Sequence, residues 1–361
     1  MASYRVGIIG CGRISPFHGM PVQALENAEV VATCDLVRRR ARQKAKQFGA
    51  SRVYADSPTA YLEMLEKEDL DVVHVCTPHY LHPEMTIAAL EAGCHVVTEK
   101  PMSIRLEDAQ RMVKTAARKK LRLGVIFQNR YNAGAVLIKN ALEFGGLGRI
   151  RAAKAVLTWY RPPSYYAKSD WKGTWDKEGG GVIIDQAIHT LDLVRWFIHS
   201  EIESVTAHIE NREHPTVEVE DTAEGVIRFR NGVNACFWAI NYYSYDANVQ
   251  IELHCSNGIA SMEAETATVR YFDGREFSAK PNPQEVFDYG GGPSYWGTSH
   301  VKEIQRFYEA LDTGERPEID GREALKTQEM ICAIYESGKR GETVVLNPPR
   351  SKRSRKNGNP G

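Results

Sequence analysis

Three polar side chains stand on one short apolar segment of this sequence, at a spacing that could serve catalysis. Asp185 and His189 are four residues apart, and Gln186 and His189 are three apart, so a helix would place them on one face. Their neighbours are mostly apolar, which indicates a lined cavity rather than a solvated surface. Histidine, with a pKa near neutral, is a suitable base for the proton of an alcohol. We expect Asp185 and His189 to be catalytic and all three side chains to contact a substrate.

A metal ion is the alternative ligand for Asp185 and His189, because a carboxylate and an imidazole at this spacing can share a cation. Catalytic zinc sites in proteins normally use three protein ligands. No third or fourth ligand is apparent in the sequence, so a site without a metal is the favoured interpretation.

A lysine follows another apolar run, in Val96-Val97-Thr98-Glu99-Lys100-Pro101. At the carboxyl end of a buried strand, Lys100 would meet the edge of a bound cofactor, and its ammonium could hydrogen-bond a substrate hydroxyl. Burial and a positively charged ligand ring beside it would lower the pKa of Lys100, while Glu99 could hold the charge in place. A surface lysine stopped by a proline is the alternative, and these residues alone do not separate the two.

An aromatic segment, residues 159–175, lies between these motifs and contains Arg161, Tyr165 and Trp175. Aromatic rings can stack on the C–H faces of sugars, and arginine can hydrogen-bond hydroxyl or acidic groups. The same residues could belong to the core or to a subunit interface. Their many polar neighbours favour a substrate-binding loop.

The loop that follows the first apolar run reads Gly10-Cys-Gly-Arg-Ile-Ser15. Gly10 permits a tight turn, and Gly12 lets the backbone approach a pyrophosphate at the start of a helix. Ser15 takes the place of a third glycine and is still small. We expect Gly10, Gly12, Arg13 and Ile14 to bind a dinucleotide.

An acidic residue at the end of the second apolar run indicates which dinucleotide this is. Asp35 lies twenty residues beyond Ser15, where it would accept hydrogen bonds from the adenosine ribose. A carboxylate there repels a 2′-phosphate and so favours NAD over NADP. The arginines at positions 38–40 could pair with such a phosphate or could form a solvated helix face, so NADP stays the alternative.

A further loop, Cys76-Thr-Pro-His-Tyr-Leu-His82, comes at the end of another predicted strand. Open α/β sheets place ligands at these strand ends. We expect Thr77, Pro78 and His82 to join Glu99 and Lys100 in the cofactor site. A histidine at the start of a helix could instead be structural or simply exposed.

The first 125 residues alternate β-branched apolar runs with helical patterns. The runs at residues 6–9, 30–34, 72–76, 95–98 and 121–127 are typical of strands buried on both faces, and helical patterns at 36–48, 58–66, 81–92 and 106–119 lie between them. This alternation predicts an α/β fold, a doubly wound parallel sheet of the Rossmann type.

The second part of the chain, residues 126–347, has a different pattern. It begins with a predicted helix at 133–143. Strand-like runs follow one another at 151–160, 203–209, 223–228, 234–241, 250–255 and 266–272, several joined by turn residues. Helices are expected at 186–197, 301–311 and 322–337. We predict an α+β domain with a large, mostly antiparallel open sheet that binds substrate. If helices pack on only one face of this sheet, the other face remains uncovered. A second copy of the chain could cover it, which favours a homodimer or homotetramer.

The composition excludes several classes of protein. Forty-six basic residues balance 46 acidic ones, which argues against nucleic-acid binding, and no apolar stretch reaches membrane-spanning length. Seven scattered cysteines without a C-x-x-C pair are typical of reduced thiols, and no signal peptide is evident, so we expect a cytoplasmic protein. The basic residues of the tail, 348–361, have no apolar companions and predict a solvated terminus.

Taken together, these motifs resemble the Gfo/Idh/MocA oxidoreductases over nearly the whole chain. The resemblance is carried by Gly10-Cys-Gly12, by Thr77-Pro78 with His82, by Glu99-Lys100-Pro101, and by Gly179-Gly180 with Asp185 and His189. Weaker markers are Glu220-Asp221 and the series His300, Phe307, Gly314 and Pro317. The resemblance implies that nicotinamide and substrate meet between a Rossmann domain and an open-sheet domain.

The same resemblance implies roles for the site residues. His189 would take the hydroxyl proton, Lys100 would bond the same oxygen and tune His189, and Asp185 would anchor a neighbouring hydroxyl while hydride passes to the nicotinamide. The substrate would be a sugar or polyol: a glycoside, nucleotide sugar or cyclitol. The aromatic segment resembles those of family members that act on glycosides or nucleotide sugars, and this resemblance leads us to the hypothesis of oxidation at a pyranose ring carbon such as C3. An NAD-dependent glycosidase that oxidises its sugar transiently, and a non-catalytic NAD(P)-binding regulator, are the alternatives.

Overall fold

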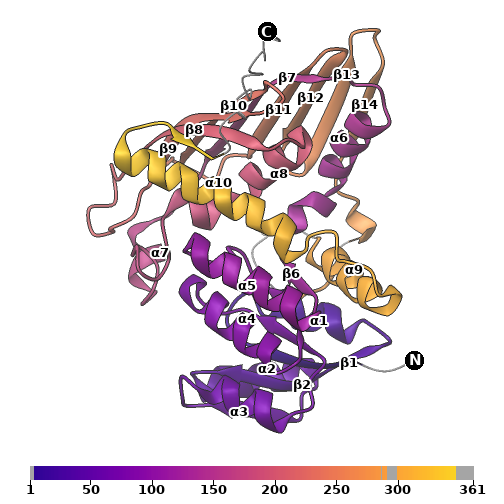
Figure 1. Ribbon diagram of the computed structural model, residues 1–361, viewed down its shortest axis with the longest axis vertical. Helices are drawn as coiled ribbons and strands as arrows, with labels where there is room; N and C mark the ends of the chain where they lie inside the picture. The colour runs from indigo at the N-terminus through magenta and orange to yellow at the C-terminus, as the bar shows by residue number, and fades with distance from the viewer. Residues whose placement is uncertain (1–3, 286, 291–298, 347–361) are drawn as a thin grey trace, which may run out of the picture.

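The computed structural model describes residues 4–285, 287–290 and 299–346. The predicted basic tail at 348–361 lies outside these residues. Figure 1 shows two sheets, the Rossmann sheet with its helices at the bottom of the view and a broad second sheet at the top.

The first sheet is parallel and has the strand order β3-β2-β1-β4-β5-β6. Its strands are β1 (Tyr4–Ile9), β2 (Ala28–Asp35), β3 (Arg52–Ala55), β4 (Val72–Val75), β5 (His95–Thr98) and β6 (Leu123–Val125), and its helices are α1 (Pro16–Gln23), α2 (Arg38–Phe48), α3 (Ala60–Lys67), α4 (His82–Glu91) and α5 (Leu106–Lys119). The strand order reverses between β1 and β4, and ligands bind at such a switch point. The loops after β1, β4 and β5 therefore lie side by side.

The second sheet has nine strands in the order β14-β13-β12-β11-β7-β10-β9-β8-β15. They are β7 (Ile150–Thr158), β8 (Ile202–Glu210), β9 (Thr222–Phe229), β10 (Asn234–Ile240), β11 (Gln250–Cys255), β12 (Gly258–Glu263), β13 (Thr266–Tyr271), β14 (Glu276–Ala279) and β15 (Val344–Val345). Among the pairings described, β7 with β10 is parallel and the others are antiparallel. The expectation of a Rossmann sheet followed by a large, mostly antiparallel sheet is confirmed.

Helices cover one face of the second sheet. These are α6 (Ala133–Glu143), α8 (Ile188–Ile198) and α10 (Gly321–Arg340), which pack on β13, β7 and β8 respectively. Alternate residues of β7, β10 and β11 point the other way and are exposed, among them Trp238 with 44% of its surface accessible. The subunit number stays a prediction.

The chain crosses back to the first sheet near its end. Helix α9 (His300–Thr313) packs on α1, and its side chains Ile304, Phe307 and Tyr308 share a core cluster with Val6 and Ile8 of β1. Helix α10 then contacts both α5 and β8, so it joins the two halves (Figure 1). Residues 300–313 thus pack with the first sheet although they come late in the sequence.

Several elements differ from the sequence-based expectations. Strands β3, β12, β14 and β15 were not predicted, because they are short or carry glycine and polar residues and form only through pairing with neighbours. The helix expected from residue 186 begins at Ile188, and Val182–Ala187 forms a π-helical turn ahead of it. Single π-helical turns are rare and occur frequently at functional sites.

Candidate active site

The glycine loop after β1 has the geometry of a dinucleotide cradle. Gly10 has a φ of +94°, and a Cβ there would lie 2.6 Å from the carbonyl of Cys76, so the chain requires glycine. A Cβ at Gly12 would meet no atom within 4 Å, which leaves the backbone open to a ligand. Arg13 is exposed and Ile14 is half-buried beside it. These features fit a bound pyrophosphate at the start of α1.

Asp35 lies at the end of β2, next to the glycine loop. Its carboxylate accepts hydrogen bonds from the backbone N–H of Cys11 (2.8 Å) and of Val37 (2.7 Å), which fixes its orientation. Arg38 pairs with Asp56 instead of turning toward Asp35. One of the three arginines that could accommodate a 2′-phosphate is therefore already engaged.

The loop after β4 has a buried histidine beneath it. The ring nitrogens of His82 lie 2.7 Å from the carbonyl oxygens of Pro101 and Thr77, so His82 joins this loop to the one after β5. The Thr77 hydroxyl is buried and, within the described residues, has no hydrogen-bond partner. Pro78 is half-buried beside it. An unsatisfied hydroxyl at this strand end fits a site that a cofactor completes.

Glu99 ends a chain of buried hydrogen bonds below the site. Tyr308 Oη lies 3.1 Å from His74 Nε2, His74 Nδ1 lies 2.9 Å from His18 Nδ1, and His18 Nε2 lies 3.0 Å from Glu99 Oε1. His300 Nε2 is 3.7 Å from the same carboxylate. Burial alone would raise the pKa of Glu99, but His18 and His300 hold it well below its ordinary value. Glu99 is therefore an ionised carboxylate beside Lys100.

Lys100 and Asp185 meet although they are far apart in the sequence. Lys100 Nζ donates to the main-chain oxygen of Asp185 at 2.7 Å and lies 3.9 Å from its Oδ1. Burial lowers the pKa of Lys100. Burial would raise the pKa of Asp185, but the nearby cations, led by Lys172, hold it well below its ordinary value. The structure thus places a lysine of lowered pKa beside an ionised aspartate.

His189 lies on the first turn of α8, close to the Lys100 ammonium. Burial and Lys100 lower the pKa of His189 to about 3, so its imidazole is neutral at physiological pH. Its Nδ1 is buried, has no hydrogen-bond partner within the described residues, and its ring packs edge-on against Phe127. The nearby Gln186 Oε1 is likewise without a partner there. Unsatisfied buried groups of this kind are expected where a ligand binds.

The π-helical turn that holds Asp185 is fixed by a buried glutamate. Glu220 accepts hydrogen bonds from the backbone N–H of Gly181 (2.8 Å) and Ile183 (3.0 Å), and Tyr335 Oη accepts from the N–H of Ile184. These groups satisfy N–H donors that a helix start leaves free. The i and i+4 spacing would place Asp185 and His189 on one face only in a continuous α-helix, but Asp185 lies in the π-helical turn. The tertiary structure, rather than this spacing, therefore brings both residues near Lys100.

Two residues of the cluster were missed by the sequence reasoning. Lys172 Nζ lies 2.8 Å from Asp185 Oδ2, and His79 Nε2 lies 3.7 Å from Asp185 Oδ1. Tyr165, which was expected to bind substrate, donates to Asp185 Oδ2 at 2.5 Å. Nothing in the local sequence of Lys172 distinguishes it from the other lysines of this segment.

The other two residues of the aromatic segment that were expected to bind substrate, Arg161 and Trp175, make different contacts. Arg161 is buried, pairs with Asp246 at 2.9 Å and stacks on Trp159 and Tyr165. These contacts hold the aromatic segment in place. Trp175 packs against Lys339 of α10 and donates to the main-chain oxygen of Glu218. The structure therefore brings Tyr165 to the cluster, while Trp175 contacts Lys339 and Glu218 instead.

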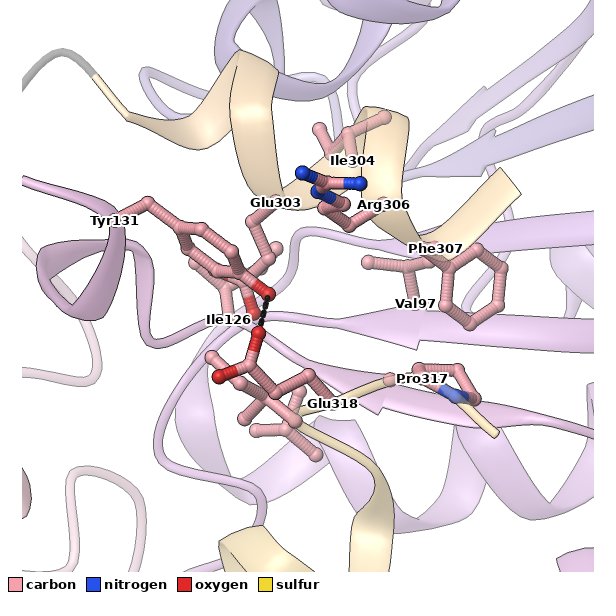
Figure 2. Close-up of a pocket in the computed structure, with 12 residues that line it drawn as sticks. Val97, Ile126, Tyr131, Glu303, Ile304, Arg306, Phe307, Pro317 and Glu318 are labelled. Carbon is pink, nitrogen blue, oxygen red and sulfur yellow. Dashed lines mark hydrogen bonds between the residues drawn. The ribbon is translucent and has the colours of Figure 1, made fainter. Parts of the chain in front are cut away.

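A small cavity between β6 and α9 is separate from this cluster. Figure 2 shows its lining, including Glu303, Phe307 and the Tyr131–Glu318 hydrogen bond of 3.1 Å. Its volume of about 10 Å³ is room for one water molecule and far too small for a sugar. Within the described residues no group of three or more histidine, cysteine, aspartate or glutamate side chains could hold a metal ion. None of the helices described has the length and apolar character needed to cross a bilayer.

Comparison with known proteins places both halves of the chain in one family. Residues 4–127 match the oxidoreductase family with an NAD-binding Rossmann fold, and residues 136–261 match the GFO/IDH/MocA C-terminal domain. The 1,5-anhydro-D-fructose reductase of Ensifer adhaerens is 31% identical, with 95% of this chain and 98% of the relative covered. The myo-inositol 2-dehydrogenase of Thermotoga maritima is 26% identical, with 88% and 91% covered.

Solved structures give the same result. The WlbA dehydrogenase of Bordetella pertussis, in complex with NADH and UDP-GlcNAcA, has a TM-score of 0.82 and 31% identity, and the match covers 96% of this chain and all of the other. The expected cofactor and enzyme class are thereby confirmed. The chain belongs to the Gfo/Idh/MocA family of NAD-dependent oxidoreductases, a family of sugar and cyclitol dehydrogenases.

Proposed function

We propose that this protein oxidises a ring hydroxyl of a glycoside or nucleotide sugar with NAD, and that the carbon oxidised is C3 of a pyranose ring. The observation that carries this proposal is the convergence of Lys100, Asp185 and His189 beside the dinucleotide loops. They come from three different segments, and each has a lowered pKa. Such perturbed groups in one place are typical of an active site.

The cofactor-binding roles follow from the positions described above. The backbone from Gly10 to Ile14 would hold the pyrophosphate, Asp35 the adenosine ribose, and Thr77, Pro78 and Glu99 the nicotinamide half. Bound NAD⁺ supplies the acceptor for the hydride that leaves the carbinol carbon. His82, with both ring nitrogens facing main-chain oxygens, would act by fixing the two loops.

The protein's own groups would handle the proton. The neutral imidazole of His189 can accept the hydroxyl proton because its lowered pKa keeps it unprotonated. The Lys100 ammonium would donate to the same oxygen and stabilise the charge that develops there. Asp185 Oδ1 would accept a hydrogen bond from a neighbouring hydroxyl, and Gln186 could bind another part of the ring.

The names of several relatives support a sugar ring as substrate. The WlbA dehydrogenase with UDP-GlcNAcA bound and the 1,5-anhydro-D-fructose reductase are each 31% identical to this chain. A D-glucoside 3-dehydrogenase of Escherichia coli is 26% identical, with 95% of this chain and 97% of the relative covered. That relative, together with the aromatic segment beside Asp185, supports C3 as the carbon.

A substrate screen with two variants tests the proposal. NADH formation is followed with alkyl glucosides, UDP-sugars and inositols, and a substrate deuterated at C3 should show a primary isotope effect. Lys100→Met and His189→Asn should each lower kcat about 10²- to 10⁴-fold and leave NAD binding, measured by calorimetry, largely intact. The exposed His208 gives a matched control, because His208→Asn should keep full activity.

The outcomes separate this function from its alternatives. Normal turnover in both variants would refute the assigned roles, and an isotope effect only at another carbon would refute C3. Release of an aglycone without net NADH would support an NAD-dependent glycosidase instead. NAD binding without turnover of any sugar would support a regulatory protein.

A further inference from the structure

The two oxygens of the Asp185 carboxylate have different partners. Oδ2 accepts hydrogen bonds from Tyr165 Oη at 2.5 Å and from Lys172 Nζ at 2.8 Å. Oδ1 lies 3.9 Å from Lys100 Nζ and 3.7 Å from His79 Nε2, both beyond hydrogen-bond distance. The contact counter-ion of Asp185 is therefore Lys172.

Lys100 makes its close contact elsewhere. Its ammonium donates at 2.7 Å to the main-chain oxygen of Asp185, a neutral acceptor, and not to the carboxylate. An ammonium bound to a neutral oxygen keeps its charge for a further partner. The Lys100 side chain is 16% exposed, so such a partner can reach it.

The Lys172 side chain is held in place on several sides. Its ammonium lies 4.4 Å from the Trp171 ring centre and 4.7 Å from the Tyr165 ring centre, in cation–π contact with both. It also lies 3.1 Å from Glu178 Oε1. Burial would lower the pKa of Lys172, but Asp185, followed by Tyr165 and Glu178, holds it well above its ordinary value. Lys172 is thus a fixed cation beside Asp185.

We propose that Lys172 is a positioning residue that neutralises Asp185 and so keeps Lys100 out of an ion pair, free to bind the substrate oxygen. This inference rests on the roles given to Lys100 and Asp185 in the proposed function. Without Lys172, the Asp185 carboxylate would form an ion pair with the next cation, Lys100. The Lys100 ammonium would then no longer be free to bind the substrate oxygen. The aromatic segment would accordingly act on catalysis as well as on sugar binding.

The charges around Lys100 decide the direction of the expected change. Burial and the Lys172 ammonium lower the pKa of Lys100. The carboxylates of Asp185, Glu99 and Glu178 raise it. Burial lowers the pKa values of the nearby imidazoles of His79, His82, His189 and His300. Removal of the Lys172 charge therefore raises the pKa of Lys100, because it removes a repulsion and frees Asp185 for attraction.

The decisive variant is Lys172→Met, examined first without cofactor. The extent of Lys100 acetylation by a pulse of acetic anhydride, measured by mass spectrometry across pH, follows the unprotonated amine. In Lys172→Met this profile should move to higher pH, and in Lys172→Arg it should return toward the wild-type position. The half-buried Lys177, whose ammonium binds the main-chain oxygen of Asp170, gives the matched control Lys177→Met with an unchanged profile.

Kinetics with the holoenzyme form the second arm. We expect kcat of Lys172→Met to fall about ten- to hundredfold, more than KM changes, because Lys100 is displaced from the reacting oxygen. We assign the high-pH limb of kcat/KM to the Lys100 ammonium, and this limb should move to higher pH. Lys172→Arg should restore most of kcat.

A double variant keeps the proposal testable if the single one does not fold. Lys172→Met leaves Glu178 buried without its cation, and Lys172→Met/Glu178→Gln removes both charges while still releasing Asp185. Its Lys100 profile should move in the same direction but by less, because Glu178 also raises the pKa of Lys100. Coincident Lys100 profiles in wild type and the folded variant would overturn the inference, even in an active enzyme. Absence of sugar oxidation by wild type would overturn the proposed function, while the labelling arm still tests Lys172.

Discussion

The buried ion pair between Arg130 and Asp192 joins helix α8 to the end of the Rossmann sheet. Arg130, in the 3₁₀ turn η2 (Gln128–Tyr131), donates to Asp192 of α8 through Nε at 2.7 Å and Nη2 at 2.6 Å. The two side chains are 2% and 1% exposed. Thr327 of α10 donates to Asp192 as well, at 2.6 Å. The substitution Asp192→Asn should therefore break the pair and leave a buried guanidinium without its main counter-ion.

Breaking a buried pair on one side typically costs about 3–5 kcal/mol. Arg130 keeps a second carboxylate, Glu323 at 3.1 Å, so we expect the lower end, about 3 kcal/mol, or roughly a hundredfold in the unfolding equilibrium constant. With an m-value near 3 kcal/mol/M, the urea midpoint followed by circular dichroism should fall by about 1 M. The exposed pair Asp108–Arg111 provides the control, since Asp108→Asn should cost less than about 1 kcal/mol.

The effect should also depend on pH with a defined sign. Burial would raise the pKa of Asp192, but Arg130 holds it below its ordinary value of 3.8. The ionised form therefore stabilises the fold above that value, and this contribution is lost as the pH falls through the lower, folded-state pKa. The difference in urea midpoint between wild type and Asp192→Asn should become smaller as the pH is lowered. An Asp192→Asn midpoint equal to that of wild type at pH 7.5 would refute the reasoning.

Two further predictions concern the cofactor loop and the buried carboxyl of Figure 2. Gly10→Ala should destabilise the fold, as measured by thermal melts, because its Cβ would lie 2.6 Å from the backbone of Cys76. Gly12→Ala should fold normally but bind NAD at least tenfold more weakly in a calorimetric titration. Equal NAD affinity of Gly12→Ala and wild type would contradict the role of this loop as a dinucleotide cradle. Burial raises the pKa of Glu303 well above 4.5, so wild type should lose stability as the pH rises above that value, and Glu303→Gln, whose amide oxygen can still accept from Phe127 N–H, should lose less. Parallel plots of Tm against pH for the two proteins would count against this.

Much of the fold was predictable because it depends on local patterns. The strands of the Rossmann sheet are apolar runs buried on both faces, and β5 and α5 have the bounds that the sequence indicates. Strands such as β3 and β14 were not predictable in this way, since they form at sheet edges through pairing with a neighbour. The late return of α9 to the first sheet was also not visible, because periodicity does not say which sheet a helix covers.

For the site, the sequence by itself determined the cofactor class and the candidate groups Lys100, Asp185 and His189. The glycine turn and Asp35 follow a fixed spacing because one loop and one strand end hold the dinucleotide. Tertiary structure alone decided which charges meet. Lys172 reaches Asp185 through a loop, a π-helical turn alters the spacing to His189, and Trp175 turns away toward α10. Such contacts join residues that no helical or strand period relates, so only the packed fold defines the charge on each group.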